Sequence, residues 1–288
     1  MQIKRILPAA AFLTLTALLC GMDWPAQEGV INRNFGWNDK GRPVKGVSFA
    51  AEGPVRAADA GEILFYNDPE SSASRIPSPL GAWIALDHGD GLMSIYSRLD
   101  EKRLPESLSL VEKDTVIASS GRSGWSGAAG FFFSIFDRRE RRWVNPVMIV
   151  APLPDTRPPA ILSATLKNAG GVVNLAQTRT ISQGRYTVAV EVSDTREGND
   201  ELPLAPFRIG CSLNGVEMAS LSFETFSVRD GIAMAYRNSL APAQEVYAPY
   251  PAFEIGDIVF TRGRITLEIT ALDAAQNPRT VTYQLQVD

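Results

Sequence analysis

The sequence predicts an all-β fold, and three observations lead to this class. Beyond residue 20, the 3.6-residue spacing of an amphipathic helix is hard to find, whereas short runs of alternating apolar and polar residues recur throughout. Gly, Pro, Asn and Asp bound these runs, as they do in turns between strands. With 288 residues, 45% of them hydrophobic, the chain is long enough for two packed cores.

Five alternating runs in the first half are the clearest predicted strands. They span residues 55–58, 61–66, 82–86, 92–96 and 131–136. Residues 87–91 read Asp-His-Gly-Asp-Gly and predict a hairpin turn, because Gly and Asp tolerate the positive φ angles of such turns. The single histidine of the chain, His88, is therefore expected to be an ordinary turn residue.

Four prolines in residues 151–159 interrupt the strand pattern, since proline cannot donate a hydrogen bond to a central sheet. We expect a linker at residues 153–159. Beyond it, seven further strands are predicted at residues 160–166, 184–192, 206–213, 218–223, 257–260, 264–271 and 279–287. This spacing is typical of an immunoglobulin-like β-sandwich, which we expect over residues 160–288.

Residues 1–20 predict an export signal, with Lys4 and Arg5 before an apolar run that is too short to span a bilayer. Cys20 stands where a bacterial lipoprotein carries its acylated cysteine, but Leu18 and Leu19 occupy positions where a small residue is usual. A lipid anchor at Cys20 and removal of Cys20 with the signal are the two alternatives. The expected location is the periplasm or cell envelope, with no transmembrane helix in the mature chain.

The balance of charge argues against a nucleic-acid partner, because 28 Lys and Arg stand against 32 Asp and Glu without a long block of one sign. Residues 137–142 hold four arginines and two acids, and we expect a solvated hairpin tip there. The alternative is contact with anionic lipid or cell-wall polymer. Residues 194–201 form an acidic stretch, which is expected to be a solvated loop rather than a calcium site.

Seven strings in the first half follow one another in the order of a known family pattern. They lie at residues 34–37, 45–51, 54–63, 83–99, 121–124, 130–135 and 144–146. Together they resemble the LytM-type (M23) zinc peptidase domain, and the resemblance covers residues 31–152. It implies an antiparallel β domain there, followed by the immunoglobulin-like sandwich.

The resemblance also implies a zinc site, yet every position that should carry its chemistry is occupied by another residue. The zinc ligands of the family align with Val44, Ser48 and Phe132, and its two other histidines align with Gly130 and Arg98. A catalytic zinc site needs about three protein ligands, mainly His and Cys, and after export the chain offers one of each. We therefore expect no cofactor and a pseudo-metallopeptidase.

The groove left by the substituted site has four candidate binding residues, namely Arg98, Trp125, Phe132 and Ser134. Strand alternation predicts that residues 130, 132 and 134 line the groove while residues 131 and 133 face the core. The forked guanidinium of Arg98 suits a carboxylate, and Trp125 is a candidate lid or anchor. The alternative is that Phe132 only fills the volume of the lost metal.

Degenerate LytM domains resemble regulators that have lost zinc and activate cell-wall amidases by direct contact. The resemblance thus predicts a non-catalytic envelope protein that binds an amidase, another envelope protein or peptidoglycan. Two alternatives remain: a structural or adhesion module, and an M23-type peptidoglycan metalloendopeptidase with an unrecognised site. A glycosidase would need Asp39, Glu52 and Asp137 in one groove.

Overall fold

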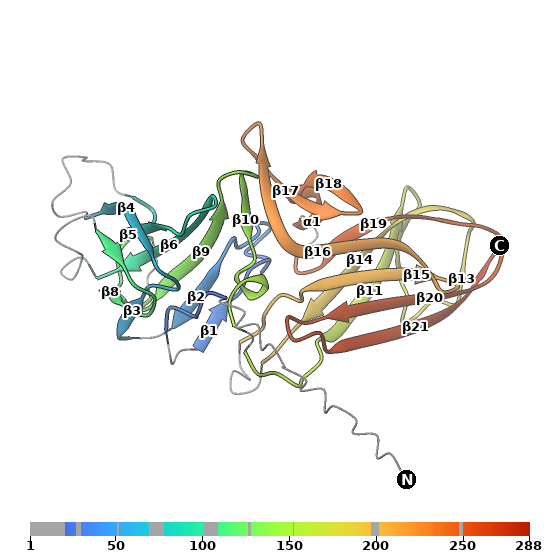
Figure 1. Ribbon diagram of the computed structural model, residues 1–288. Coiled ribbons are helices and arrows are strands. Elements are labelled where there is room, and N and C mark those ends of the chain that lie inside the picture. The colour runs from blue at the N-terminus through green and yellow to red at the C-terminus, as the bar shows by residue number, and fades with distance from the viewer. Residues whose placement is uncertain are drawn as a thin grey trace, which may run out of the picture.

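The computed structural model describes residues 21–26, 30–50, 52–68, 78–100, 109–125, 128–151, 153–196, 202–247 and 250–288, so the predicted export signal and Cys20 lie outside it. In the described part, almost all regular structure is β-strand, with one short helix, α1 (Ala243–Tyr247), and one 3₁₀ turn at Pro146–Met148 (Figure 1). The predicted all-β class is confirmed. Among these residues, no helix has the length and apolar character needed to cross a membrane.

The N-terminal part of the structure, up to residue 151, is built on antiparallel strands. They are β1 (Val30–Arg33), β2 (Val47–Ala50), β3 (Pro54–Arg56), β4 (Gly61–Asn67), β5 (Ala82–Asp87), β6 (Leu92–Leu99), β7 (Leu110–Val111), β8 (Val116–Ser119), β9 (Phe131–Asp137) and β10 (Arg142–Val144). The main sheet runs in the order β10-β9-β6-β5-β4-β7, β2 also pairs with β9, and β3 pairs with β8. The five predicted strands correspond to β3, β4, β5, β6 and β9. The predicted turn at residues 87–91 closes the β5–β6 hairpin, where Gly89, Asp90 and Gly91 have positive φ.

Alternation along β9 fixes which side chains reach the core. Phe131 and Phe133 are buried, and each packs against another ring, Phe131 on Phe49 at 4.8 Å and Phe133 near Tyr96 at 5.3 Å between centroids. Aromatic side chains bury large apolar areas, so these contacts hold β9 firmly against its neighbours. The residue between them, Phe132, is only half-buried and faces the other side of the sheet.

The C-terminal part, from residue 153, is a sandwich of two sheets. Its strands are β11 (Ala160–Asn168), β12 (Gly171–Asn174), β13 (Thr180–Ile181), β14 (Gly184–Ser193), β15 (Arg208–Leu213), β16 (Val216–Arg229), β17 (Ile232–Arg237), β18 (Ser239–Pro242), β19 (Phe253–Phe260), β20 (Gly263–Leu272) and β21 (Pro278–Val287). One sheet has the order β12-β11-β14-β19 and the other begins β13-β21-β20-β15-β16. Their inner faces share one apolar core. All seven predicted strands are present; the immunoglobulin-like assignment stays a prediction.

The two parts are joined by a continuous sheet, which the sequence did not predict. Strand β10 pairs with β16, with Trp143 opposite Phe226, so hydrogen bonding passes from one part to the other (Figure 1). Phe35 of the N-terminal part belongs to the C-terminal core and stacks on Phe226 at 4.8 Å. The Tyr247 hydroxyl donates to the Gly36 carbonyl at 2.8 Å. Residues 153–159, the predicted linker, therefore connect parts that are already in contact.

Candidate functional site

A cavity of about 370 Å³ lies beside β2 and β9, where the sequence predicts a groove. Five of the seven predicted positions line it: Val44, Ser48, Arg98, Trp125 and Gly130. The other two, Phe132 and Ser134, are not among the lining residues; Ser134 is buried within the sheet. The prediction missed Asn32 and Arg33 of β1, and it placed Phe131 in the core, whereas Phe131 is both buried and part of the cavity lining.

Strand pairing explains how these residues meet. Ser48 of β2 is the register partner of both Phe132 on β9 and Arg33 on β1, so three strands bring their side chains to one place. The sequence prediction lacked β1 and β2, and with them the position of Arg33. Gly130 lies at the start of β9, where a Cβ atom would come within 2.0 Å of the Phe49 carbonyl oxygen. Only glycine fits this approach of the two strands.

Arg98 reaches the cavity because of a bulge in β6. The register shifts so that Ala82 pairs with Leu99 and Trp83 pairs with Ser97, which leaves Arg98 without an opposite residue on β5. Its φ of +65° lies in the left-handed region, and its N–H donates to the Leu80 carbonyl at 2.8 Å. Few non-glycine residues adopt this backbone conformation, and those that do cluster at functional sites.

The Arg98 guanidinium lies over an aromatic ring. Its Cζ lies 5.2 Å from the centre of the Phe132 ring, and Nη1 lies 3.5 Å from Ser48 Oγ. In the described part of the chain, no carboxylate lies within ion-pair distance of Arg98. The group is thus oriented, and among the described residues only Ser48 is an acceptor for its five N–H donors.

The cavity carries an excess of positive charge. Its lining includes the two cations Arg33 and Arg98 and one anion, Asp39, which gives a formal sum of +1. Burial, followed by repulsion from Arg33, lowers the pKa of Arg98, whereas Asp39 acts in the opposite direction. Arginine remains charged despite such a shift, so the cavity holds a partly desolvated cation. Asn32 adds a buried Oδ1 atom that has no hydrogen-bond partner among the described residues.

His88 serves the framework and lies apart from the cavity lining. Its Nδ1 lies 2.8 Å from the Ala60 carbonyl oxygen and its Nε2 lies 2.7 Å from Ser94 Oγ. Ser94 Oγ is in turn 3.0 Å from the Tyr96 hydroxyl, which accepts the Ala58 N–H at 2.8 Å. Both ring nitrogens are therefore engaged in tying the β5–β6 hairpin to the preceding loop, as expected for a turn residue.

The three carboxylates considered for a glycosidase do not meet. Asp39 lines the cavity, while Asp137 lies at the far end of β9 and accepts the N–H groups of Arg139 and Glu140, both at 3.0 Å. Glu52 lies 3.8 Å from Arg122 in an exposed ion pair. The basic stretch that begins at Asp137 is confirmed as a hairpin tip, between β9 and β10.

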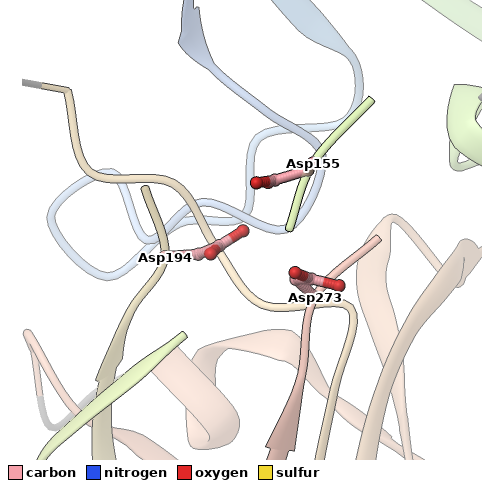
Figure 2. A group of neighbouring side chains, drawn as sticks. All are labelled: Asp155, Asp194 and Asp273. Carbon is pink, nitrogen blue, oxygen red and sulfur yellow. The ribbon is translucent and has the colours of Figure 1, made fainter. Parts of the chain in front are cut away.

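A second group of acids lies at the junction of the two parts. Figure 2 shows Asp155, Asp194 and Asp273 converging from three separate segments, with carboxylate oxygens within 4.8 Å of one another. Asp194 is 4% exposed and Asp273 is 1% exposed. The predicted solvated loop is therefore wrong at Asp194; residues 197–201 lie outside the described part. Among the described residues, this is the one group of three His, Cys, Asp or Glu close enough to share an ion.

The environment of this group raises the pKa of two of its carboxyls, those of Asp194 and Asp273. Burial, then the negative charges of Asp273 and Asp155, raise the pKa of Asp194 to about 7. Burial also raises the pKa of Asp273, although hydrogen bonds from Asn277 act against this; Asn277 donates its N–H at 2.8 Å and its Nδ2 at 2.7 Å to the carboxylate. Three close carboxylates cannot all ionise at low cost in a buried site. An all-oxygen group of this kind also differs from the His and Cys ligands typical of zinc.

The N-terminal part is thus an antiparallel β domain with a cavity beside β2 and β9. Residues 42–146 match the sequence model of peptidase family M23, so the chain contains an M23 domain. A second family model matches residues 158–288. No curated protein matches the sequence.

The chain also matches parts of several solved peptidase structures, among them an M23 protein. A mutant catalytic domain of the prophage-encoded M23 protein EnpA from Enterococcus faecalis is 20% identical, with 43% of this chain and 94% of that chain covered and a TM-score of 0.36. A zinc-containing peptidase from Vibrio cholerae is 23% identical, with 46% and 41% covered and a TM-score of 0.38. Lysostaphin from Staphylococcus simulans is 16% identical, with 75% and 85% covered and a TM-score of 0.35.

Proposed function

We propose that this protein acts in the cell envelope without catalysis, and that its M23 domain binds an extended peptide in place of cleaving it. The single observation that carries the proposal is the pair of arginines, Arg33 and Arg98, in the cavity that aligns with the zinc site of the family. These two arginines would repel a zinc ion bound beside them, because charges of the same sign interact strongly at short range in a partly buried site.

The donor atoms of the cavity do not fit zinc. Its lining offers one carboxylate, on Asp39, and one hydroxyl, on Ser48. Tetrahedral zinc takes mainly His nitrogen and Cys sulfur. His88 is engaged with Ala60 and Ser94, and Cys211 is buried in the C-terminal core, where burial raises its pKa to about 12 and opposes the thiolate form that metals require.

The same cavity suits a peptide ligand. A volume of about 370 Å³ is within the range of small-ligand pockets. Apolar side chains such as Val44 and Phe49 line it beside the polar groups, which is the usual composition of a binding site. Trp125, at 81% exposure, stands at its edge and offers a large surface for a partner.

The partner we propose is a cell-wall hydrolase of the amidase type, or the peptide of peptidoglycan itself, after export through the signal at residues 1–20. The resemblance to degenerate LytM regulators supports a hydrolase partner. A structural or adhesion module is the second candidate, and the continuous sheet through β10 and β16 favours it, because a shared sheet suits a rigid spacer.

Three assays on the purified protein separate these functions. Stoichiometric zinc together with digestion of peptidoglycan would show that the protein is a metallopeptidase. Co-purification with an amidase that is lost in Arg98→Asn but kept in Arg122→Ala would support the regulator; Arg122 is an exposed arginine outside the cavity lining. Retention on isolated cell wall that both variants keep would support the structural module.

A further inference from the structure

The charge and geometry of the M23 cavity indicate what kind of peptide it binds. We propose that the cavity takes the terminal carboxylate of an extended peptide, with Arg98 as the principal contact and Arg33 as the second. This inference rests on the proposed function, in which the cavity binds without cleaving. It adds a ligand class, a peptide with a free carboxyl end.

Arg98 meets the requirements of a carboxylate receptor. The Phe132 ring supports the guanidinium, with Cζ 5.2 Å from the ring centre, and the contact with Ser48 at 3.5 Å is too long to occupy a donor fully. A planar guanidinium with free donors binds a carboxylate through two parallel hydrogen bonds. Because the side chain is partly buried, such a pair is less screened than one on the open surface.

Arg33 provides the second positive charge at the mouth of the cavity. Its guanidinium carbon lies 5.7 Å from the centre of the Trp37 ring, and among the described residues no carboxylate is within ion-pair distance of it. Repulsion between Arg33 and Arg98 is a cost that a bound anion removes. The two residues are therefore expected to bind one anion cooperatively.

The charge sum favours a carboxylate over a phosphate. Two arginines and Asp39 give +1, which one carboxylate neutralises, whereas a phosphate with nearly two charges would face the Asp39 carboxylate. Asn32, whose buried Oδ1 lacks a partner in the described part, also lines the cavity and adds a polar group beside the two arginines. These features together select a short peptide end.

The test compares two versions of one probe, an acetylated tetra-alanine peptide with either a free carboxyl or an amidated C-terminus. Binding to the purified full-length protein is followed through tryptophan fluorescence, since Trp125 borders the cavity. We expect the free acid to bind about tenfold more tightly than the amide, as loss of a charge-assisted hydrogen bond predicts. A third peptide, amidated but with an internal glutamate, tests whether a side-chain carboxylate substitutes for the terminus.

The variants are chosen to keep the fold. Asparagine tolerates the left-handed backbone of Arg98, so Arg98→Asn removes the cation with little backbone strain. We expect Arg98→Asn to abolish the preference for the free acid over the amide, so that the two peptides bind about equally. Arg33→Gln should reduce the preference to a few-fold, and Arg122→Ala should leave it unchanged. Thermal unfolding of each variant verifies folding.

The possible results separate this inference from the proposed function. Equal binding of acid and amide, unaffected by Arg98→Asn, would overturn the carboxylate assignment while peptide binding itself stands. Stronger binding of the internal glutamate than of the free terminus would overturn the assignment to a peptide end. Preference for inorganic phosphate over the acid peptide would do the same. Hydrolysis of peptidoglycan with zinc would overturn both.

Discussion

Arg98 and Phe132 form a stacked pair, with the guanidinium carbon 5.2 Å from the ring centre. Both residues occupy positions that align with histidines of zinc peptidases in the M23 family resemblance. The pair connects β6 to β9 across the sheet, because β6 and β9 are hydrogen-bonded neighbours. The pair places a partly buried cation, supported by an aromatic ring, at the cavity.

Replacement of Phe132 by leucine is expected to weaken ligand binding without unfolding the protein. A cation–π contact contributes about 0.5–1 kcal/mol, so affinity for the acid peptide should fall about 2- to 5-fold. Isothermal titration measures the change. Phe136→Leu is the matched control, since Phe136 packs on Trp143 and does not line the cavity. An unchanged affinity in Phe132→Leu would show that the contact between Arg98 and Phe132 does not contribute to binding.

Gly130→Ala is expected to be more destabilising than a glycine substitution elsewhere with the same backbone angle. Gly130 has φ of +141° and no room for a Cβ atom, whereas Gly184 has φ of +148° and nothing within 4 Å. Gly184→Ala should cost about 1–3 kcal/mol from backbone strain alone, and Gly130→Ala about 2 kcal/mol more from the clash with Phe49. Urea denaturation compares the two. Equal losses would contradict the close approach of β2 and β9.

Asp194→Asn is expected to change how stability depends on pH. The folded-state pKa of about 7 lies above the usual carboxyl value of 3.8, so the folded state binds the extra proton between these values. Stability of the wild type should therefore fall as pH rises from 4 to 7, relative to the variant, by a few kcal/mol. Asp230→Asn, in an exposed turn, is the control. If the stability of wild type and of Asp194→Asn changed in parallel from pH 4 to 8, the raised pKa of Asp194 would be contradicted.

The shared sheet predicts that the two parts unfold together. All five tryptophans lie in the first 143 residues, so tryptophan fluorescence reports on the N-terminal part and, through Trp143, on its junction with the C-terminal core. Phe260 is buried in the C-terminal core, and Phe260→Ala should cost about 3–5 kcal/mol. We expect the fluorescence transition in urea to shift by the same amount as the circular dichroism transition.

A second substitution shows whether the junction causes this coupling. Phe226 contacts Phe35 and faces Trp143, so Phe226→Ala removes packing at the junction itself. We expect two separate transitions in this variant. If the wild type already unfolds in two steps, the parts are independent and the junction is weaker than the packing indicates.

The sequence predicted much of the fold because alternation is a local property. The strands β5, β6, β9, β14, β20 and β21 show clear alternation. Their predicted ends lie within one residue of the observed ends, except that β6 extends to Leu99. The short strands β1, β2 and β10 carry too few residues for a pattern to emerge. Because these strands were not predicted, neither the position of Arg33 on β1 nor the pairing of β10 with β16 could be predicted.

The candidate site was predicted in part, and for the same reason. Arg98, Val44 and Ser48 were found through the family resemblance, which supplies positions that local patterns cannot. The position of Arg98 on a bulge, with positive φ, had no local sign in the sequence. The buried position of Asp194 was also missed, because its partners Asp155 and Asp273 are distant in sequence and meet only in the folded chain.

The most direct measurement is the release of soluble fragments from purified peptidoglycan by the protein after incubation with equimolar zinc. We expect no release above the buffer control, while the protein remains folded and binds the free-acid peptide. Release that depends on zinc and stops on addition of a chelator would contradict it, because the cavity lined by Arg33 and Arg98 would then support catalysis.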